Sequence, residues 1–259
     1  MRLADKVALV TGGASGIGAA IARLFGREGA SVAIVDIDPV GGGALAQTIQ
    51  AAGGRAEFVN ADVSATDTPK RVVDAVIADF GRLDVLVNNA AILRVGDITE
   101  TTLEDWDEIM AVNLRATALF CREAVSQMRR QGAGSIVNVA STAALVGEPR
   151  LAVYIASKGG IISLSRALAI DHAQDGIRVN CLCPGSTRTP LTDRLLAGTS
   201  EPEALMENLL KVLPMHRQGT PDEVANGALF LASDEAAYVT GSVVTIDGGF
   251  TLGRLLADK

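Results

Sequence analysis

Short apolar runs rich in β-branched residues alternate with longer segments of helical periodicity along the whole chain. The runs that predict buried strands are 7–10, 32–36, 56–60, 85–88, 135–139, 178–181 and 242–246. Between them apolar residues recur at helical spacing, as at Ile17, Ile21 and Leu24. This alternation is typical of βαβ units, in which helices cover both faces of a parallel sheet. The pattern therefore predicts an α/β fold with a doubly wound parallel sheet of about seven strands.

Capping signals place some helix ends. Thr102 followed by two acidic residues predicts the start of a long helix that continues to about Gln131. Thr220 and Pro221 predict a second start, with proline at the first helical position. The three glycines at 41–43 each weaken a helix by roughly 1 kcal/mol relative to alanine, and no function follows from them.

The stretch 188–217 is longer than an ordinary strand-to-helix connection. It is rich in leucine: Leu191, Leu195, Leu196, Leu205, Leu209, Leu210 and Leu213. We interpret it as a partly helical substrate lid, and a surface subdomain that packs its leucines inward is an equal alternative. All 259 residues fit one domain, with 188–217 as an insertion within it, because no linker composition or repeat divides the chain.

Charge narrows the classes of partner. Thirty acidic and 23 basic residues give a net charge of −7, which disfavours nucleic acid and anionic lipid as ligands. The chain enters its first apolar run at Val7, which leaves no room for a signal peptide, and no apolar stretch is long and clean enough for a membrane span. We therefore expect a cytoplasmic protein that acts on small molecules.

The cysteines predict neither disulfides nor a metal site. Cys121, Cys181 and Cys183 are odd in number and suit a reducing compartment, so we interpret them as core residues. With only His172 and His216 besides them, no metal-ligand spacing can be assembled.

A glycine-rich loop follows the first predicted strand directly. Gly12, Gly16 and Gly18 lie in the run Thr11–Gly18, which leads into a helix near Ile17. Glycines let the backbone approach a pyrophosphate, and the helix N-terminus presents free N–H groups to it. The context predicts a Rossmann-type nucleotide site, although any glycine-rich turn would give the same residues.

Asp36 ends the second predicted strand, where such folds place the acid that binds the adenosine ribose hydroxyls. A carboxylate there repels a 2′-phosphate, and neither Ile37 nor Ser15 supplies a compensating cation. We therefore predict NAD(H) rather than NADP(H).

Tyr154 and Lys158 are four residues apart in a helical segment, so both side chains lie on one face, with Ser141 thirteen residues upstream. A lysine cation at ~4 Å, with an effective dielectric of ~20, favours the ionised phenol by about 4 kcal/mol, roughly three pKa units. This predicts a tyrosine that acts as acid or base near neutral pH. Taken alone, the pair could equally be a buried tyrosine beside a lysine that extends to solvent.

Eight motifs in register make the chain resemble the short-chain dehydrogenases/reductases over essentially its whole length. They are Thr11–Gly18, Asp62-Val63, Asn88-Asn89-Ala90, Asn113, Ser141, Tyr154-x-x-x-Lys158, Pro184-Gly185 and Ile246–Gly249. The departures, Ala91 in place of the usual glycine and Thr187 in place of a β-branched apolar residue, remove no catalytic group.

The resemblance implies roles for particular residues. Tyr154 would be the general acid or base, Ser141 would bind the substrate oxygen, Lys158 would hold the nicotinamide ribose, and Asn113 would support a water relay. The residues implied in cofactor binding are Gly12, Ser15, Gly16, Ile17, Gly18, Asp36, Asp62, Val63, Asn89, Ala90, Tyr154, Lys158, Pro184, Gly185, Thr187 and Thr189. Asp62 and Val63 would contact the adenine, and Thr187 and Thr189 the carboxamide end of the nicotinamide.

These residues favour an NAD(H)-dependent oxidoreductase that interconverts a secondary alcohol and a ketone, with 1–259 as a single dinucleotide-binding and catalytic domain. Its rival is an NADPH-dependent carbonyl or 3-oxoacyl reductase, which Asp36 disfavours. A nucleotide-sensing protein without turnover would be expected to lack one of Asn113, Ser141, Tyr154 and Lys158, and all four are present.

Substrate and assembly are less constrained. Apolar residues near Ser141, such as Leu145 and Leu151, indicate an apolar pocket, and Arg94, Glu148, Arg150 and Arg188 could recognise a polar or anionic group at its rim. Each of these four could equally be a solvated surface charge. The family resemblance implies a homotetramer, whose contacts would use Ile161, Ile162, Leu164, Leu168, Leu252, Leu255 and Leu256 unless these residues belong to the intrachain core.

Overall fold

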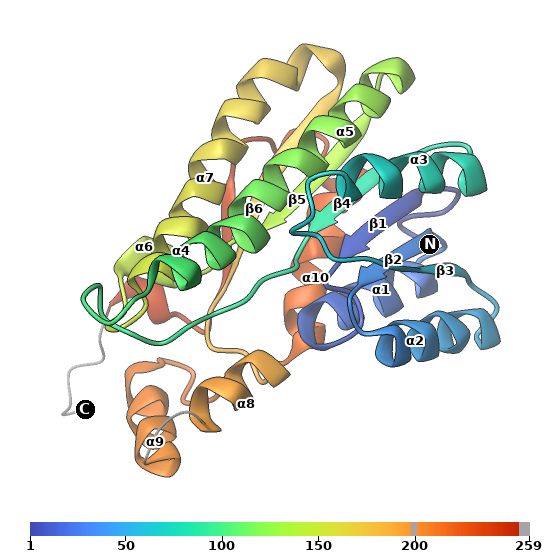
Figure 1. Cartoon of the computed structure of the whole chain (residues 1–259). Helices are drawn as coiled ribbons and strands as arrows, with labels where there is room; N and C mark the ends of the chain where they lie inside the picture. Colours follow the sequence, from blue (N-terminus) through green and yellow to red (C-terminus); the bar gives the residue numbers. More distant parts are fainter. Residues whose placement is uncertain (198–200, 254–259) are drawn as a thin grey trace.

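The computed structural model describes residues 1–197 and 201–253, in which a seven-stranded parallel sheet forms the centre (Figure 1). The strands are β1 (Val7–Thr11), β2 (Ser31–Asp36), β3 (Arg55–Asn60), β4 (Val85–Asn88), β5 (Gly134–Val139), β6 (Ile177–Pro184) and β7 (Val243–Ile246). All seven predicted strands are confirmed: β1, β2, β3 and β5 are one residue longer than predicted, β4 agrees, β6 is four residues longer and β7 is one residue shorter. Their spatial order is β3-β2-β1-β4-β5-β6-β7, and every neighbouring pair is parallel.

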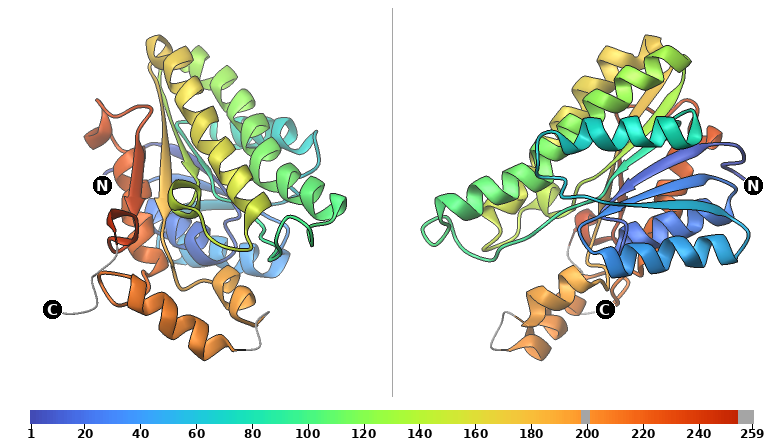
Figure 2. Two further views of the ribbon diagram at one scale, coloured as in Figure 1. Left: turned by 90° about the vertical axis from the view of Figure 1, so that its left-hand side faces the viewer. Right: turned by 45° about the vertical axis from the view of Figure 1, so that its right-hand side comes forward.

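Helices cover both faces of the sheet, which produces three layers (Figure 2). The long helices are α1 (Gly16–Arg27), α2 (Pro39–Ala51), α3 (Thr68–Phe80), α5 (Ala116–Gln131), α7 (Ala152–His172) and α10 (Pro221–Ala232). One core cluster joins α1, α2 and α10 to the sheet, for example through Phe25, Ile49 and Leu229. A second cluster on the opposite face joins α3 and α5 through Val76 and Phe120. The predicted doubly wound architecture is confirmed.

The strand order reverses between β1 and β4. The chain runs outward from β1 through β2 to β3 and then returns to pair β4 with β1, as at Ala8 and Val85. The connections that leave β1 and β4 therefore diverge to opposite sides, and a crevice opens at the carboxyl ends of these strands. The fold thus places the loops after β1 and β4 where open α/β sheets bind their ligands.

The helix predicted from Thr102 to Gln131 is present, with an irregularity that its sequence did not indicate. Thr102 caps α4 (Leu103–Ile109) by accepting a hydrogen bond from Asp105 N at 3.1 Å, and α5 ends at Gln131, followed by Gly132 in a left-handed conformation. Between α4 and α5 lies a π-helical turn, η1 (Met110–Arg115). Such turns are rare inside α-helices and are frequent at functional sites.

The stretch 188–217 is partly helical, as predicted. It contains α8 (Pro190–Ala197) and α9 (Pro202–Val212), which stand apart from the three layers on the side of the strand carboxyl ends (Figures 1 and 2). Four further short segments complete the described elements: α6 (Ala143–Val146), η2 (Ala173–Asp175), η3 (Asp234–Ala236) and η4 (Phe250–Leu252).

One described segment, Ala152–Asp175, is long and apolar enough to cross a membrane by length and composition alone, which corrects the expectation of none. It consists of α7 with η2, and its residues Ile161 and Ile162 are buried against Cys181 and Cys183 of β6. The apolar character of α7 therefore follows from its packing on the central sheet. The two isoleucines thus belong to the intrachain core; Leu255 and Leu256, named with them as assembly contacts, lie outside the described residues.

The glycine run in α2 has a packing reason. A Cβ on Gly42 would lie 2.0 Å from the Phe58 ring on β3, whereas a Cβ on Gly43 would meet no atom within 4 Å. Gly42 therefore lets α2 approach the sheet closely, and Gly43 has no such contact to protect.

Two alanine substitutions should separate these positions. Gly42→Ala should lower the free energy of unfolding, because overpacking against Phe58 costs about 1–3 kcal/mol and outweighs the helix-propensity gain. Gly43→Ala should raise it by up to about 1 kcal/mol. Urea denaturation of both variants measures the difference, and an equal effect of the two substitutions would contradict this account of α2.

Candidate active site

The loop after β1 is held in place by the loop after β4. Asn89 donates from Nδ2 to the carbonyl oxygens of Thr11 and Gly12 at 3.1 and 2.9 Å, and Thr11 Oγ1 accepts from the backbone N–H groups of Asn89 and Ala90. Gly18 is packed so closely that a Cβ there would lie 2.1 Å from Gly12 O. Glycine at 18 is therefore required for the turn into α1. Gly18 does not line the cavity that this loop borders, and it supports the loop by this close packing against Gly12.

The N-terminus of α1 is free to meet an anion. The N-cap residue Ser15 makes no side-chain capping hydrogen bond to a described residue, and the first turn of α1 carries no acidic side chain. The loop borders a cavity of about 520 Å³ whose lining includes Gly12, Ser15, Gly16, Ile17, Asp36, Asp62, Val63, Asn89, Ala90 and Thr189. An uncapped helix N-terminus facing a cavity of this size fits the diphosphate of a dinucleotide.

Asp36 lies at the far end of this cavity. Its Oδ2 accepts from Ala14 N at 2.9 Å and its Oδ1 from Asp38 N at 3.0 Å. These bonds fix the carboxylate beside the glycine loop and leave acceptor capacity on both oxygens for ribose hydroxyls.

The charges that line this cavity are mostly negative. Asp36, Asp38, Asp62 and Glu108 all border it, and Arg194 of α8 is the one cationic side chain among its described lining residues. Sequence reasoning missed both Arg194 and Glu108, because nothing in the local pattern shows that α4 and α8 face the same cavity.

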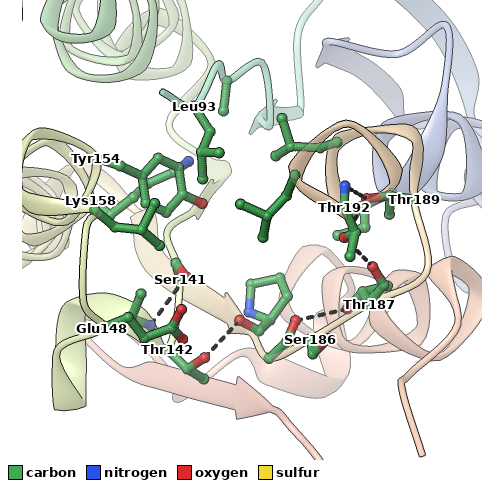
Figure 3. A pocket seen from close by; sticks show the side chains of 18 of the residues that line it. Leu93, Ser141, Thr142, Glu148, Tyr154, Lys158, Ser186, Thr187, Thr189 and Thr192 are labelled. Carbon is green, nitrogen blue, oxygen red and sulfur yellow. Dashed lines mark hydrogen bonds between the residues drawn. The ribbon is translucent and has the colours of Figure 1, made fainter. Parts of the chain in front are cut away.

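Three of the four predicted catalytic residues, Ser141, Tyr154 and Lys158, meet in a second cavity of about 260 Å³ next to the first (Figure 3). Ser141 follows β5, and Tyr154 and Lys158 lie on α7. The Tyr154 hydroxyl points into the cavity (Figure 3). The predicted cofactor residues found here are Ile17, Asn89, Tyr154, Lys158, Pro184, Gly185, Thr187 and Thr189. Because Ile17, Asn89 and Thr189 border both cavities, the two form one groove from Asp36 to Tyr154.

The predicted lowering of the tyrosine pKa is wrong for this state of the protein. Burial raises the pKa of Tyr154 to about 12, and a hydrogen bond with Ser141 offsets only part of that rise. The Lys158 Nζ lies over the tyrosine ring, 5.7 Å from its centroid, and donates to Val139 O at 2.8 Å. The geometric prediction of one shared face therefore holds, but the ammonium faces the ring and the β5 backbone.

Lys158 is itself almost fully buried, with 2% of its surface exposed. Burial lowers the pKa of its ammonium to about 8. Burying a charged ammonium costs free energy, and its hydrogen bond to Val139 O offsets part of that cost. Its position between β5 and Tyr154 is typical of a functional lysine.

Asn113 lies in the π-helical turn η1 and lines neither cavity. Its amide is saturated: Nδ2 donates to Ile92 O at 3.0 Å and to Ser157 Oγ at 3.1 Å, and Oδ1 accepts from Ile92 N at 2.9 Å. Asn113 thus ties the chain after β4 to α7, one residue away from Lys158. The sequence located this residue, and only the structure shows what it holds.

The three cysteines are free and buried, as predicted, and the described residues contain no cluster of metal-ligating side chains. Burial raises the pKa of Cys121 to about 12, so its thiol is not nucleophilic.

A groove of two adjoining cavities at the switch point of a doubly wound sheet, with a buried Tyr–Lys pair and a serine at one end, is typical of a dinucleotide-binding oxidoreductase. The chain belongs to the short-chain dehydrogenase/reductase family.

Comparison with known proteins establishes that membership. Residues 12–251 match the family model described as enoyl-(acyl carrier protein) reductase. The chain is 42% identical to the 3-oxoacyl-[acyl-carrier-protein] reductase FabG of Thermotoga maritima, over 97% of this chain and 100% of that protein. It is 41% identical to D-threitol dehydrogenase of Mycolicibacterium smegmatis, over 97% of this chain and 95% of that protein.

The fold agrees with a solved structure. Levodione reductase superposes with a TM-score of 0.94 at 33% identity, covering 97% of this chain and 100% of that one. The resemblance predicted from the motifs is therefore confirmed, and the protein is an oxidoreductase of the alcohol dehydrogenase/3-oxoacyl reductase type.

Proposed function

We propose that this protein is an NAD(H)-dependent oxidoreductase that interconverts a secondary alcohol and a ketone, with Tyr154 as the proton-transferring residue. The observation that carries the proposal is the single groove that runs from the Asp36 carboxylate to the Tyr154 hydroxyl. When bound, the nicotinamide supplies the hydride acceptor or donor.

Tyr154 and Ser141 act on the substrate oxygen, by proton transfer and by a hydrogen bond respectively. In oxidation, the alcohol carbon gives up a hydride and its oxygen gives up a proton to Tyr154; in reduction both transfers reverse. Ser141 holds that oxygen by a hydrogen bond as its charge changes. Because the pKa of Tyr154 is raised to about 12, the phenol is protonated at neutral pH and is ready to act as the acid that ketone reduction needs.

Lys158 and Asn113 act further from the reacting atoms. Lys158 is proposed to bind the nicotinamide ribose through its buried ammonium. Asn113 is proposed to support a water relay from its position beside Ser157. The segment 188–217 is proposed as a lid, since Leu191, Leu195, Leu196, Leu205, Leu209 and Leu213 line the cavity around Tyr154. A homotetramer remains our proposal from the family.

Electrostatics favours NAD(H) over the NADP(H) of the rival 3-oxoacyl reductase function. A 2′-phosphate would sit beside Asp36 in a cavity that Asp38 and Asp62 also border. Arg194, the cationic side chain among the described lining residues, is on α8 and donates from Nε to Pro190 O at 3.2 Å. No ion pair between Asp36 and a described cation is present, so the fixed carboxylate repels a dianion.

Steady-state kinetics with both cofactors tests this proposal. Wild-type protein should oxidise simple secondary alcohols with NAD⁺, followed by NADH absorbance, and kcat/KM for NAD⁺ should exceed that for NADP⁺ by at least about 100-fold. Asp36→Ala should lower that ratio at least about tenfold, mainly through KM for NADP⁺. Asp79→Ala, at an exposed acid on α3 far from the groove, serves as the matched control. A higher kcat/KM with NADP⁺ in the wild type would favour the rival function.

A further inference from the structure

Among the residues that the structure describes, Glu148 supplies the one carboxyl group that lines the cavity of Tyr154. This residue follows Ser141 by seven positions, lies on the same wall of the cavity as Ser141 and Thr142 (Figure 3), and is partly buried. The rest of the lining is largely apolar, with Leu93, Leu151 and the leucines of α8 and α9. Glu148 makes no hydrogen bond or ion pair to any described residue, so its carboxyl oxygens are free to accept one from a ligand.

The other polar side chains of this cavity already make hydrogen bonds within the protein. Thr142 and Thr187 donate to the carbonyl oxygens of Pro184 and Gly185 at 3.2 and 3.0 Å, and Thr192 donates to Thr187 O at 2.7 Å. Ser186 Oγ accepts from Gln218 at 3.0 Å. After the Tyr154–Ser141 pair is assigned to the reacting oxygen, Glu148 is the polar side chain of the described lining that makes no hydrogen bond within the protein.

The loop that presents Glu148 is held in an uncommon conformation. Arg150 has a φ of 60°, in the left-handed region that costs a non-glycine residue about 1–2 kcal/mol. The loop is fixed there because Arg150 O accepts from Gly96 N at 2.9 Å and the Arg150 guanidinium pairs with Glu100 at 2.6 Å. Pro149 restricts the backbone of Glu148 as well. These contacts orient Glu148 toward the cavity.

The arginines that could have received an anionic substrate are absent from the cavity lining. Arg94 pairs with Glu108 at 2.9 Å and Arg150 with Glu100, both outside the cavity, and Arg188 does not line it. An anionic group would therefore meet the Glu148 carboxyl, and the cation among the described lining residues, the Lys158 ammonium, already donates to Val139 O at 2.8 Å. Burial raises the pKa of that carboxyl, and its charge in turn raises the pKa of Tyr154, so the two groups are within electrostatic reach.

A substrate cation is also disfavoured, since the buried ammonium of Lys158 borders the same small cavity. The substrate group that best fits the Glu148 carboxyl in this largely apolar cavity is a neutral hydrogen-bond donor. A hydroxyl satisfies the acceptor without adding charge, and hydrogen bonds to charged groups are among the stronger ones.

We propose that Glu148 is a specificity-determining residue that accepts a hydrogen bond from a second hydroxyl of the substrate, so that the preferred substrates are small diols and their hydroxyketones. This inference rests on the proposed alcohol–ketone function and narrows its substrate class. Long acyl thioesters and carboxylated alcohols would be poor substrates.

Matched pairs of alcohols test the proposal. The probes are butan-2-ol against butane-2,3-diol, and cyclohexanol against trans-cyclohexane-1,2-diol, each with NAD⁺ and with NADP⁺. The wild type should show a kcat/KM for the diol that is at least about tenfold above that for the monool. Glu148→Leu should reduce this diol-to-monool ratio at least about tenfold, and Glu148→Gln, which retains an acceptor oxygen, should give an intermediate ratio.

Glu104→Gln is the matched control, because Glu104 is exposed on α4 and lines neither cavity, so the ratio should not change. A wild type that oxidises monools and diols equally well, or a ratio that Glu148→Leu leaves unaltered, would overturn the role of Glu148 while sparing the proposed function. A preference for the amino alcohol 3-aminobutan-2-ol over the diol would overturn the neutral-donor assignment. No oxidation of any probe with either cofactor would instead overturn the proposed function itself.

Discussion

Replacing Tyr154 by phenylalanine should lower kcat for alcohol oxidation and for ketone reduction by about 10²–10⁴-fold, the range that a positioned general acid or base contributes. The substitution removes only the hydroxyl, so the ring keeps its packing against Lys158 Nζ, 5.7 Å from the ring centroid. Binding of NADH, measured by fluorescence titration, should therefore change by less than about threefold. The measurement is single-turnover hydride transfer, which separates the chemical step from binding.

The chain offers a matched control for this change. Tyr238 is the second of its two tyrosines and is fully exposed, so Tyr238→Phe should leave both kcat and NADH binding unaltered. If Tyr154→Phe retained wild-type turnover, Tyr154 would have no part in proton transfer.

The direction of the tyrosine pKa gives the same experiment a pH dependence. Oxidation needs the ionised phenol, whose fraction increases with pH up to the pKa, which burial raises to about 12. The rate of alcohol oxidation should therefore increase with pH across the neutral and mildly alkaline range, and ketone reduction should not. The phenylalanine variant should lose this slope together with its turnover.

Replacing Lys158 by methionine should lower activity and at the same time stabilise the folded protein. The Lys158 residue is 2% exposed, and its ammonium donates a hydrogen bond to Val139 O. Its removal should weaken NADH binding at least about tenfold if it holds the nicotinamide ribose. An apolar side chain of similar length avoids burying a charge, so the free energy of unfolding at pH 7 should increase by about 1–3 kcal/mol.

The stabilisation should depend on pH in a defined way. Burial lowers the pKa of Lys158 from 10.5 in the unfolded chain to about 8 in the folded protein. Below about pH 8 both states carry the proton, so the cost of the buried charge is present in full. Between pH 8 and 10.5 the folded protein has lost the proton and unfolding takes one up, so wild-type stability increases with pH in this window.

The gain from Lys158→Met should therefore be largest at pH 7 and smaller at pH 9.5, as measured by urea denaturation of the protein without cofactor. Lys70→Met is the control, because the Lys70 side chain is 65% exposed and pairs with Asp74 on the surface. A variant that is less stable than the wild type at pH 7 would show that Lys158 contributes more by its hydrogen bond than its burial costs.

Local patterns were sufficient for the elements of the fold. The seven apolar runs predicted the seven strands because β-branched residues buried on both sheet faces have a characteristic length and composition. The Thr102 cap predicted the start of α4 because capping depends on residues within one turn. The π-helical turn at Asn113 was not predictable, since it depends on the contact between Asn113 and Ser157 of α7.

The sequence alone determined the fold class, the family and the identity of the serine, tyrosine, lysine and glycine-loop residues, because each of these depends on spacing along the chain. The tertiary structure decided the burial and the hydrogen-bond partners of those residues. It turned the Lys158 ammonium toward the Tyr154 ring and Val139 O, paired Arg94 and Arg150 with acids outside the cavity, and left the Glu148 carboxyl facing it. The desolvation of a side chain and the identity of its hydrogen-bond or ion-pair partners depend on which segments pack against it. Those segments are far apart in the chain, so local sequence patterns do not indicate them.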